Sequence, residues 1–344
     1  MKFVTSLAPI GCVAMLLMGT AGACAQTAMS DAEMADLVAA ATAEGHLMIY
    51  SGANTEQLER YVAGFEKAYP DIDAEFQRLT GAQTTQRFST EAAAGITQAD
   101  IVGTSESSFF DDSDGWFMDL SQTNLPNYVG WPADAKSNYR AIVTRGVLGL
   151  IYNTDMVSPE EAPKVWMDVI DPKWKGNIIL ADTQSSVNWG GWLKVMHDTF
   201  GDSFIQSLAG QDFQVVASAQ TGAQQVGAGA KPLNFPSASS FGLSLKAEGA
   251  PIEYVYMAEP TVTNRFNFGV AAAAPHPNAA KLFMNWLLSP DGITATCTNY
   301  VVMSPGDADG ALGCMATPKG NVVEIADGLD EAEMTKLFDM LGVK

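Results

Sequence analysis

Residues 149–176, GLIYNTDMVSPEEAPKVWMDVIDPKWKG, are the most informative part of the chain, because they combine a strand, a turn, a short helix and a second turn. The apolar run 147–152 predicts a buried strand, and the polar residues 153–155 predict its end. Ser158 and Pro159 are typical of a helix N-cap and first helical position. Trp166 and Ile170 lie four apart, on one helical face. Asp171 and Pro172 then predict the end of the helix.

The first 25 residues have the layout of a secretory signal peptide. Lys2 precedes an apolar run at 7–18, and Ala23-Cys24-Ala25 fits a small-residue cleavage site, which makes Gln26 the expected mature N-terminus. Cys24 supports an alternative, cleavage before a lipid-modified cysteine. No segment has the length of a membrane-spanning helix. We therefore expect an exported, soluble protein without direct membrane insertion, located in the periplasm.

The chain is strongly acidic. It carries 39 Asp and Glu against 19 Lys and Arg, a formal net charge of -20, which becomes -21 when the signal's only charged residue, Lys2, is removed. Such a surface repels phosphate backbones and anionic lipids, so the charge argues against nucleic-acid binding and a peripheral membrane role. A saline habitat is another explanation for an acidic surface. The charge therefore indicates solubility more clearly than it indicates a ligand.

Beyond the signal segment the chain has two cysteines, Cys297 and Cys314. An even number of cysteines in an oxidising compartment favours a disulfide over a metal site or a catalytic pair. His46, His197 and His276 are scattered, and no zinc-ligand spacing is present. The sequence predicts no metal site and no cofactor.

About 320 mature residues can bury a large core, and a chain of that length usually forms two domains. In the first part of the chain, expected strands at 47–50, 74–78 and 100–103 alternate with expected helices at 58–69 and 84–94. The pattern then restarts. Its second part has expected strands at 177–181, 213–217 and 231–235 and expected helices at 189–200, 204–208 and 221–226. Residues 254–257 and 268–274 lead back, before a helix at 278–288.

Alternating strands and helices predict an α/β protein of two lobes. Each lobe is expected to be a mostly parallel sheet flanked by helices, and crossing hinge strands join the two. We assign residues 26–144 to the first part of lobe 1 and residues 145–256 to lobe 2. Residues 257–344 return to lobe 1 and end in C-terminal helices, some of them packed on lobe 2. Ligands of such folds bind beyond the carboxyl ends of the strands, in the hinged cleft.

Four expected strand-to-helix turns are rich in small polar residues. Backbone N–H groups and hydroxyls at helix starts bind carboxylate or phosphate without a cation, although each such residue also serves as an ordinary helix cap. The candidate ligand-binding residues in these turns are Ser51, Asn54, Thr104, Ser105, Glu106, Ser185, Ser186, Val187, Asn188, Ser237, Ser239 and Ser240.

Two aromatic residues flank the turns. Trp189 and Phe235 are candidates for flat walls against an organic ligand, with core packing as the alternative. Arg145 and Arg265, beside the expected crossing strands, could bind a carboxylate with two hydrogen bonds or simply neutralise the acidic chain. Glu259, like Glu106 in the second turn, could accept from an ammonium or a hydroxyl, or lie on the surface.

Several short motifs resemble periplasmic solute-binding proteins of the ferric-iron-binding type. They are Tyr-Ser-Gly at 50–52, Gln-Ala-Asp-Ile at 98–101, Pro-x-x-Trp-x-Asp at 163–168, Asp-Pro-Lys-Trp-Lys-Gly at 171–176 and Pro-Asp-Gly at 290–292. The resemblance covers nearly the whole mature chain. It implies a type II periplasmic binding protein that acts as a monomer and closes its two lobes over a solute. Such a protein delivers the solute to an ABC permease with its ATPase and does not alter it chemically.

The residues that hold iron in that family are missing. The family's tyrosine pair aligns with Ser239 and Ser240, its histidine with Asn54 and its glutamate with Ser105. Phenolate and carboxylate oxygens suit Fe(III), so their loss removes the standard iron site. The family's anion-binding turn aligns with Ser185, Ser186 and Val187 and keeps its character. The resemblance thus implies a small organic anion such as a carboxylate, phosphonate or phosphate ester. Ferric iron or a ferric chelate in a non-standard site is the alternative.

An enzyme is the least supported reading. Gly201-Asp202-Ser203 resembles a hydrolase motif but lies between expected helices, without a suitably placed histidine. Gly222, Gly227 and Gly229 lack the spacing of a dinucleotide-binding loop. We therefore expect no catalytic residues, and a secreted hydrolase stays a minor alternative.

Overall fold

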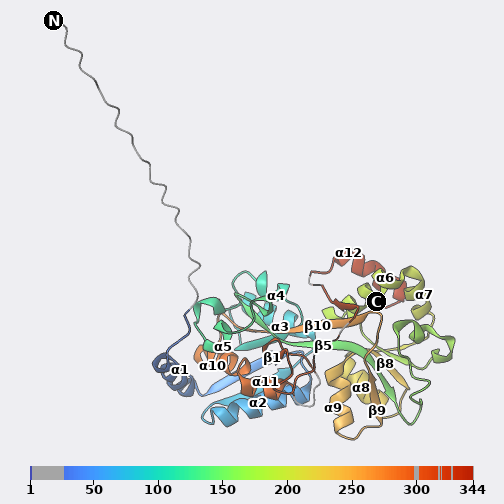
Figure 1. Cartoon of the computed structure of the whole chain (residues 1–344), viewed down its shortest axis with the longest axis horizontal. Coiled ribbons are helices and arrows are strands. Elements are labelled where there is room, and N and C mark those ends of the chain that lie inside the picture. Colours follow the sequence, from blue (N-terminus) through green and yellow to red (C-terminus); the bar gives the residue numbers. More distant parts are fainter. Residues whose placement is uncertain (2–26, 298–301, 317, 319, 327, 344) are drawn as a thin grey trace.

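The computed structural model describes residue 1 and residues 27–343, except 298–301, 317, 319 and 327. The predicted signal peptide, its cleavage site and Cys24 lie outside the described residues. The rest of the chain forms two lobes, which lie side by side in Figure 1 and are connected by long strands.

Lobe 1 contains three parallel strands in the order β2 (Asp73–Arg78), β1 (His46–Ser51) and β3 (Ile101–Thr104). Its main helices are α1 (Asp31–Glu44), α2 (Thr55–Ala68), α3 (Gly81–Ala93), α10 (Pro277–Leu287) and α11 (Pro290–Cys297), with short helices α4 (Ser108–Asp111) and α5 (Pro126–Val129). The rings of Phe65, Phe283 and Trp286 pack together in its core, where burial of apolar surface stabilises the lobe.

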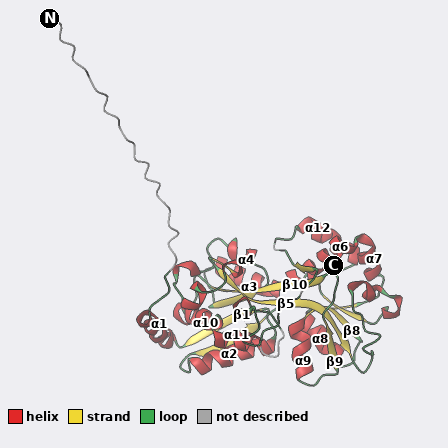
Figure 2. Cartoon of the chain, viewed as in Figure 1, coloured by secondary structure: helices red, strands yellow, loops and turns green. Residues whose placement is uncertain are grey.

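Lobe 2 repeats the arrangement with parallel strands in the order β8 (Leu233–Ala238), β6 (Ile178–Ala181) and β7 (Gln214–Val216). Helices α6 (Val187–Phe200), α7 (Asp202–Ala209), α8 (Ala219–Gly227), α9 (Ser239–Ala247) and the C-terminal α12 (Glu331–Leu341) surround them. Figure 2 shows the strands inside each lobe and the helices around them. Trp166, Trp192 and Phe235 are fully buried in the core of this lobe.

Two long antiparallel strands, β5 (Arg140–Asn153) and β10 (Thr261–Val270), run between the lobes. Because β10 pairs with β3 and β5 pairs with β8, the 11 strands that the structure describes form one sheet, which confirms the predicted fold class. The remaining strands are β4 (Lys136–Ser137), β9 (Ile252–Val255) and β11 (Val322–Glu324). The pairing shifts register between Phe266 and Asn267. The returning strand β10 begins at Thr261 and ends at Val270, whereas the sequence predicted it at 268–274.

Residues 149–176 contain the end of the predicted strand but not the predicted helix. Residues 159–162 form turns, and single 3-10 turns follow at Trp166–Ile170 and Pro172–Trp174. Pro163 interrupts a helix begun at Ser158, because proline lacks the N–H donor and restricts the residue before it. Trp166 nevertheless packs as expected: its indole N–H donates to Pro260 O at 2.9 Å, and the ring lies 5.3 Å from Trp192.

The strand of this segment lies in close contact with β9. A Cβ at Gly149 would lie 2.2 Å from the Val255 carbonyl oxygen and 2.7 Å from the Tyr254 hydroxyl. Only glycine allows the two strands to approach this closely.

A disulfide joins Cys297 and Cys314, as the cysteine count predicted. It connects the end of α11 to the long C-terminal connection that leads towards β11 and α12.

Candidate ligand-binding cleft

A cavity lies between the lobes, above the crossing strands. Its lining comes from both lobes and from the strands that join them: Gly52, Ala53, Asn54, Gln57, Arg78, Thr80, Gly81, Ser105, Thr144, Gly146, Ser185, Ser186, Asn188, Trp189, Ser218, Ala219, Ala238, Ser240, Phe241, Asn264, Phe266 and Val302. We call this cavity the cleft.

Helices from both lobes begin at the cleft. Four of these helices have a side-chain N-cap, whose oxygen accepts a hydrogen bond from a backbone N–H of the first turn. The N-caps are Asn54 of α2, Thr80 of α3, Ser186 of α6 and Ser218 of α8. Helix α9 begins after Ala238 without a side-chain cap. All these N-cap residues line the cleft. Because the N-terminal end of a helix carries partial positive charge, their convergence favours an anion.

Arg78, at the end of β2, is the only charged residue among the described residues that line the cleft. Its side chain is half-buried, and its Nε has no hydrogen-bond partner within the described part of the chain. Burial lowers the pKa of the guanidinium, while the nearby carboxylate of Glu56 acts to raise it. An arginine stays protonated under these conditions. The cleft is therefore positively charged inside a protein of net charge -20.

The serine hydroxyls at the cleft differ in what they can donate. Ser185 Oγ donates to Asp182 O at 2.7 Å, which uses its only proton. Ser186 Oγ instead accepts from Asn188 N at 3.2 Å, and Ser105 Oγ accepts from Asn188 Nδ2 at 2.8 Å. Ser186 and Ser105 therefore keep a proton to donate, since neither donates to an acceptor within the described residues.

Hydrogen bonds cross the cleft and join the lobes. Asn54 Nδ2 donates to Ser240 O at 3.1 Å, and the Ala82 N–H donates to Ser185 O at 3.2 Å. The Asn188 contact with Ser105 is a third link between the lobes. The side chains at the helix starts thus both line the cleft and hold its two walls together.

The structure brings about half of the predicted site residues to the cleft. These are Asn54, Ser105, Ser185, Ser186, Asn188, Trp189 and Ser240. Glu106 and Val187 line a second, neighbouring cavity together with Arg265 and Leu329, and Ser105 and Asn188 lie between the two cavities. Ser51, Thr104, Phe235, Ser237 and Ser239 are buried and do not line either cavity.

Phe235 does not line the cleft. Its ring is fully buried in lobe 2 and lies 6.0 Å from that of Trp192, an arrangement that fits the core-packing alternative. Ser51 Oγ accepts from Ala53 N at 3.2 Å and thereby stabilises the turn after β1. The carbonyl of Thr104 accepts from Asn267 Nδ2. Both residues support the turns without reaching the cleft.

Arg145 and Arg265 do not supply the cation of the cleft. Both guanidinium groups bind Glu324 on β11, with N–O distances of 3.0 Å and 2.5 Å. This one carboxylate bridges the two arginines, offsets part of their charge and ties β11 to the crossing strands. Glu259 is exposed and lies outside the lining of the cleft.

Sequence reasoning missed several lining residues, above all Arg78, Thr80, Ser218, Thr144 and Asn264. Thr80 and Ser218 cap helices that follow β2 and β7, so the rule of strand-to-helix turns would have found them if the starts of α3 and α8 had been placed correctly. Thr144 and Asn264 lie within the crossing strands, where the sequence alone carries no signal of a ligand.

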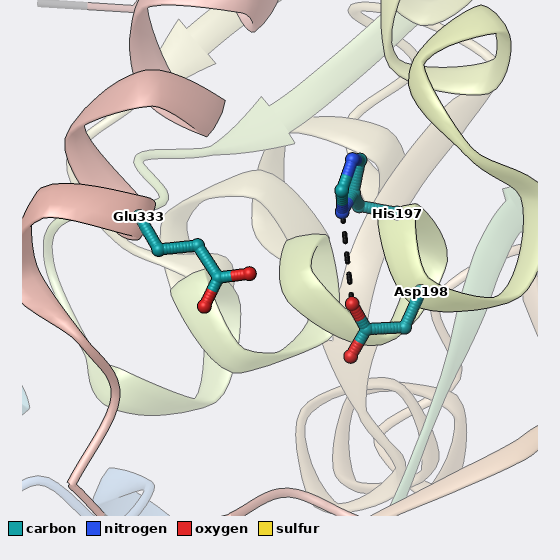
Figure 3. Close-up of side chains that lie close together, drawn as sticks. All are labelled: His197, Asp198 and Glu333. Carbon is teal, nitrogen blue, oxygen red and sulfur yellow. Dashed lines mark ion pairs between the residues drawn. The ribbon is translucent and has the colours of Figure 1, made fainter.

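A candidate metal cluster lies elsewhere, on the outer surface of lobe 2. His197, Asp198 and Glu333 come close together where α6 meets α12 (Figure 3). Lys194 binds both acids, at 2.8 Å from Asp198 and 3.1 Å from Glu333. Because the Lys194 ammonium already bridges these two carboxylates, the cluster is better described as an ionic contact that holds α12 on lobe 2.

Comparisons with known proteins agree with this geometry. An uncharacterized protein of Haemophilus influenzae is 27% identical over 264 residues, which cover 73% of this chain and 75% of the relative. A substrate-binding protein of an ABC transporter from Agrobacterium tumefaciens superposes with a TM-score of 0.75 at 18% identity, covering 88% of this chain and 96% of that one. The periplasmic binding protein AfuA from Actinobacillus pleuropneumoniae, with fructose-6-phosphate bound, superposes with a TM-score of 0.72 at 21% sequence identity. The superposition covers 87% of this chain and 99% of that one.

The two lobes, the crossing strands and the cleft between them define a solute-binding protein of the type II architecture. Residues 51–294 match the family model of bacterial extracellular solute-binding proteins, and the chain belongs to this family. The resemblance seen in the sequence is thus confirmed, and so is the expectation of a binding component of an ABC transporter rather than an enzyme. None of the helices that the structure describes is both long and apolar enough to cross a membrane.

Proposed function

We propose that this protein captures a small organic anion in the cleft, in the periplasm, and delivers it as a monomer to an ABC permease with its ATPase. The ligand is a carboxylate, a phosphonate or a phosphate ester. The observation that carries the proposal is Arg78, an arginine that forms no ion pair with a described residue and lies in a cleft whose other described lining residues are uncharged.

The charge distribution supports an anion over a cation. In an acidic chain, a cation-binding cleft would be expected to contain carboxylates, as buried charges require partners. The cleft instead combines one guanidinium with helix N-termini and with the hydroxyls of Ser186 and Ser105. An anion would satisfy all three kinds of donor at once.

Ferric iron is the weaker candidate. Fe(III) favours phenolate and carboxylate oxygens, and no tyrosine, aspartate, glutamate or histidine lies within the described lining of the cleft. The positions that align with the family's tyrosine pair are Ser239, which is buried, and Ser240, whose carbonyl binds Asn54. A ferric chelate would have to bind through the anionic part of the chelator.

A ligand screen tests the proposal. Purified mature protein is mixed with carboxylates, phosphonates, phosphate esters, polyamines and ferric salts, and thermal shift is followed by native mass spectrometry. We expect stabilisation by one or more organic anions, because a ligand that binds the folded state raises the melting temperature. Stabilisation by polyamines or ferric salts alone, with no response to any anion, would refute the anion proposal.

A further inference from the structure

The floor of the cleft contains polar side chains that an anion alone does not satisfy. Asn264 on β10 lies opposite Gly146 on β5, and Thr144 lies opposite Phe266. Asn264 and Thr144 are each 6% exposed, and both line the cleft. Since side chains alternate along a strand, the neighbouring Arg265 points to the other face, where it binds Glu324.

The Asn264 amide has no hydrogen-bond partner among the described residues. Its Oδ1 is buried and receives no hydrogen bond from any described residue, and no described group accepts from its Nδ2. The Thr144 hydroxyl likewise makes no hydrogen bond within the described part of the chain. Gly146 gives the amide its room, because a Cβ there would lie 2.6 Å from Asn264 Oδ1. The floor therefore presents, side by side on paired strands, an amide and a hydroxyl that no described residue hydrogen-bonds.

A buried acceptor without a donor costs about 1–3 kcal/mol, so a group that enters the cleft gains by supplying a proton. The oxygens of a carboxylate or phosphate dianion cannot supply one, since they only accept. An ammonium can, but it would share the cleft with the Arg78 guanidinium and find no carboxylate among the described lining residues. A hydroxyl fits, and it pairs with either end of the amide because it both donates and accepts.

We infer that the ligand is a hydroxylated organic anion, whose charged group binds at Arg78 and the helix starts while a hydroxyl binds the amide of Asn264 and the hydroxyl of Thr144. This inference rests on the proposed function and narrows its substrate class to hydroxy acids, sugar acids and phosphate esters of polyols. The rings of Trp189 and Phe241, which also line the cleft, provide apolar cover for the carbon skeleton.

Matched pairs of ligands test the inference by titration calorimetry. Glycerol 3-phosphate is compared with propyl phosphate, and gluconate with hexanoate, so that only the hydroxyls differ within a pair. For wild-type protein we expect the hydroxylated member of at least one pair to bind about tenfold more tightly, which corresponds to one buried hydrogen bond. In Asn264→Leu, an apolar variant of similar volume, we expect this preference to fall below about threefold, with the deoxy partner bound as before.

Two further variants guard against a misfolded protein. Thr144→Val removes the neighbouring hydroxyl at nearly equal volume and is expected to reduce the same preference by a smaller factor. Asn177→Leu makes the identical chemical change at an exposed position outside the cleft and should leave the preference intact. Circular dichroism and melting temperature establish that each variant is folded.

The outcomes separate the inference from the proposal beneath it. Equal binding of both members of each pair in wild-type protein, lost in Arg78→Gln, would overturn the hydroxyl inference and leave the anion proposal standing. A hydroxyl preference that survives in Asn264→Leu would also overturn it. Binding of no anion by wild-type protein would overturn both.

Discussion

The replacement Arg78→Gln is expected to weaken binding of an organic anion strongly while leaving the fold intact. The guanidinium is half-buried, its Nε has no described partner, and burial lowers its pKa, so the folded protein bears the cost of desolvating an unpaired cation. A hydrogen bond to a charged group contributes about 1.5–3 kcal/mol, which corresponds to a rise of about 10- to 150-fold in Kd. Glutamine keeps much of the side chain's length and polarity but not its charge.

The stability of the ligand-free variant provides the second part of this prediction. Because Arg78 forms no ion pair with any described residue, its removal breaks no described salt bridge and relieves the cost of desolvating a cation, so the melting temperature of Arg78→Gln should equal or exceed that of wild type. An arginine retained for stability would behave in the opposite way and lower the melting temperature when replaced.

Titration calorimetry with the tightest anion of the screen measures the loss, and Arg60→Gln is the matched control. Arg60 lies on α2 of the same lobe, donates to Ala295 O at 3.0 Å and does not line the cleft. Both variants change the net charge by the same amount, so a general electrostatic effect would weaken binding equally. Equal losses, or an unchanged Kd in Arg78→Gln, would refute the assignment of Arg78 as the anion's counter-charge.

Three further predictions concern the hydroxyls, the disulfide and the crossing strand. Ser186→Ala should raise the Kd for the anion about fivefold, because the Ser186 hydroxyl still has a proton to donate. Ser185→Ala should change the Kd less than twofold, because the Ser185 hydroxyl already donates its proton to Asp182 O. The reverse order in calorimetry would contradict this hydrogen-bond assignment. Denatured, unreduced protein that begins at Gln26 should show no free thiol in a colorimetric thiol assay. Loss of the Cys297–Cys314 bridge, with its sequence separation of 17, should lower the free energy of unfolding by about 3 kcal/mol. Gly149→Ala should lower the free energy of unfolding by about 1–3 kcal/mol in denaturant titrations, because the new Cβ collides with the Val255 carbonyl oxygen. Gly130→Ala is the control and should be nearly neutral, because the atom nearest to its new Cβ lies 3.5 Å away.

The sequence predicted the two-lobed architecture because its buried strands are continuous apolar runs. Residues 178–181 of β6 are fully buried, and such a run leaves few alternatives to a strand inside a parallel sheet. The helix after Ser158 was predicted wrongly, since capping residues indicate the start of a turn but not how many turns follow. There Asp168 accepts from the N–H groups of Lys164 and Val165 and so stabilises a tight turn in place of a helix.

The candidate site was predicted less well than the fold, and for a physical reason. Asn264 and Arg265 interrupt the apolar pattern of β10, because Asn264 lines the cleft and Arg265 binds Glu324. Arg78 ends an ordinary strand, and the fact that no described acid pairs with it is visible only once the charges around it are placed in space. Charge pairing between distant residues leaves no periodic trace in a sequence.

The hinge of this protein is a pair of hydrogen-bonded strands rather than a loop. Strands β5 and β10 stay paired from one lobe to the other, with a single shift of register at Phe266 and Asn267. Bending and twisting of such a ribbon would separate the lobes without breaking its backbone ladder. Amide protons in the middle of both strands should therefore exchange slowly with deuterium whether the lobes are together or apart. The N–H of Ala82, which donates across the cleft to Ser185, should exchange faster as soon as the lobes part, and so its exchange rate reports opening directly.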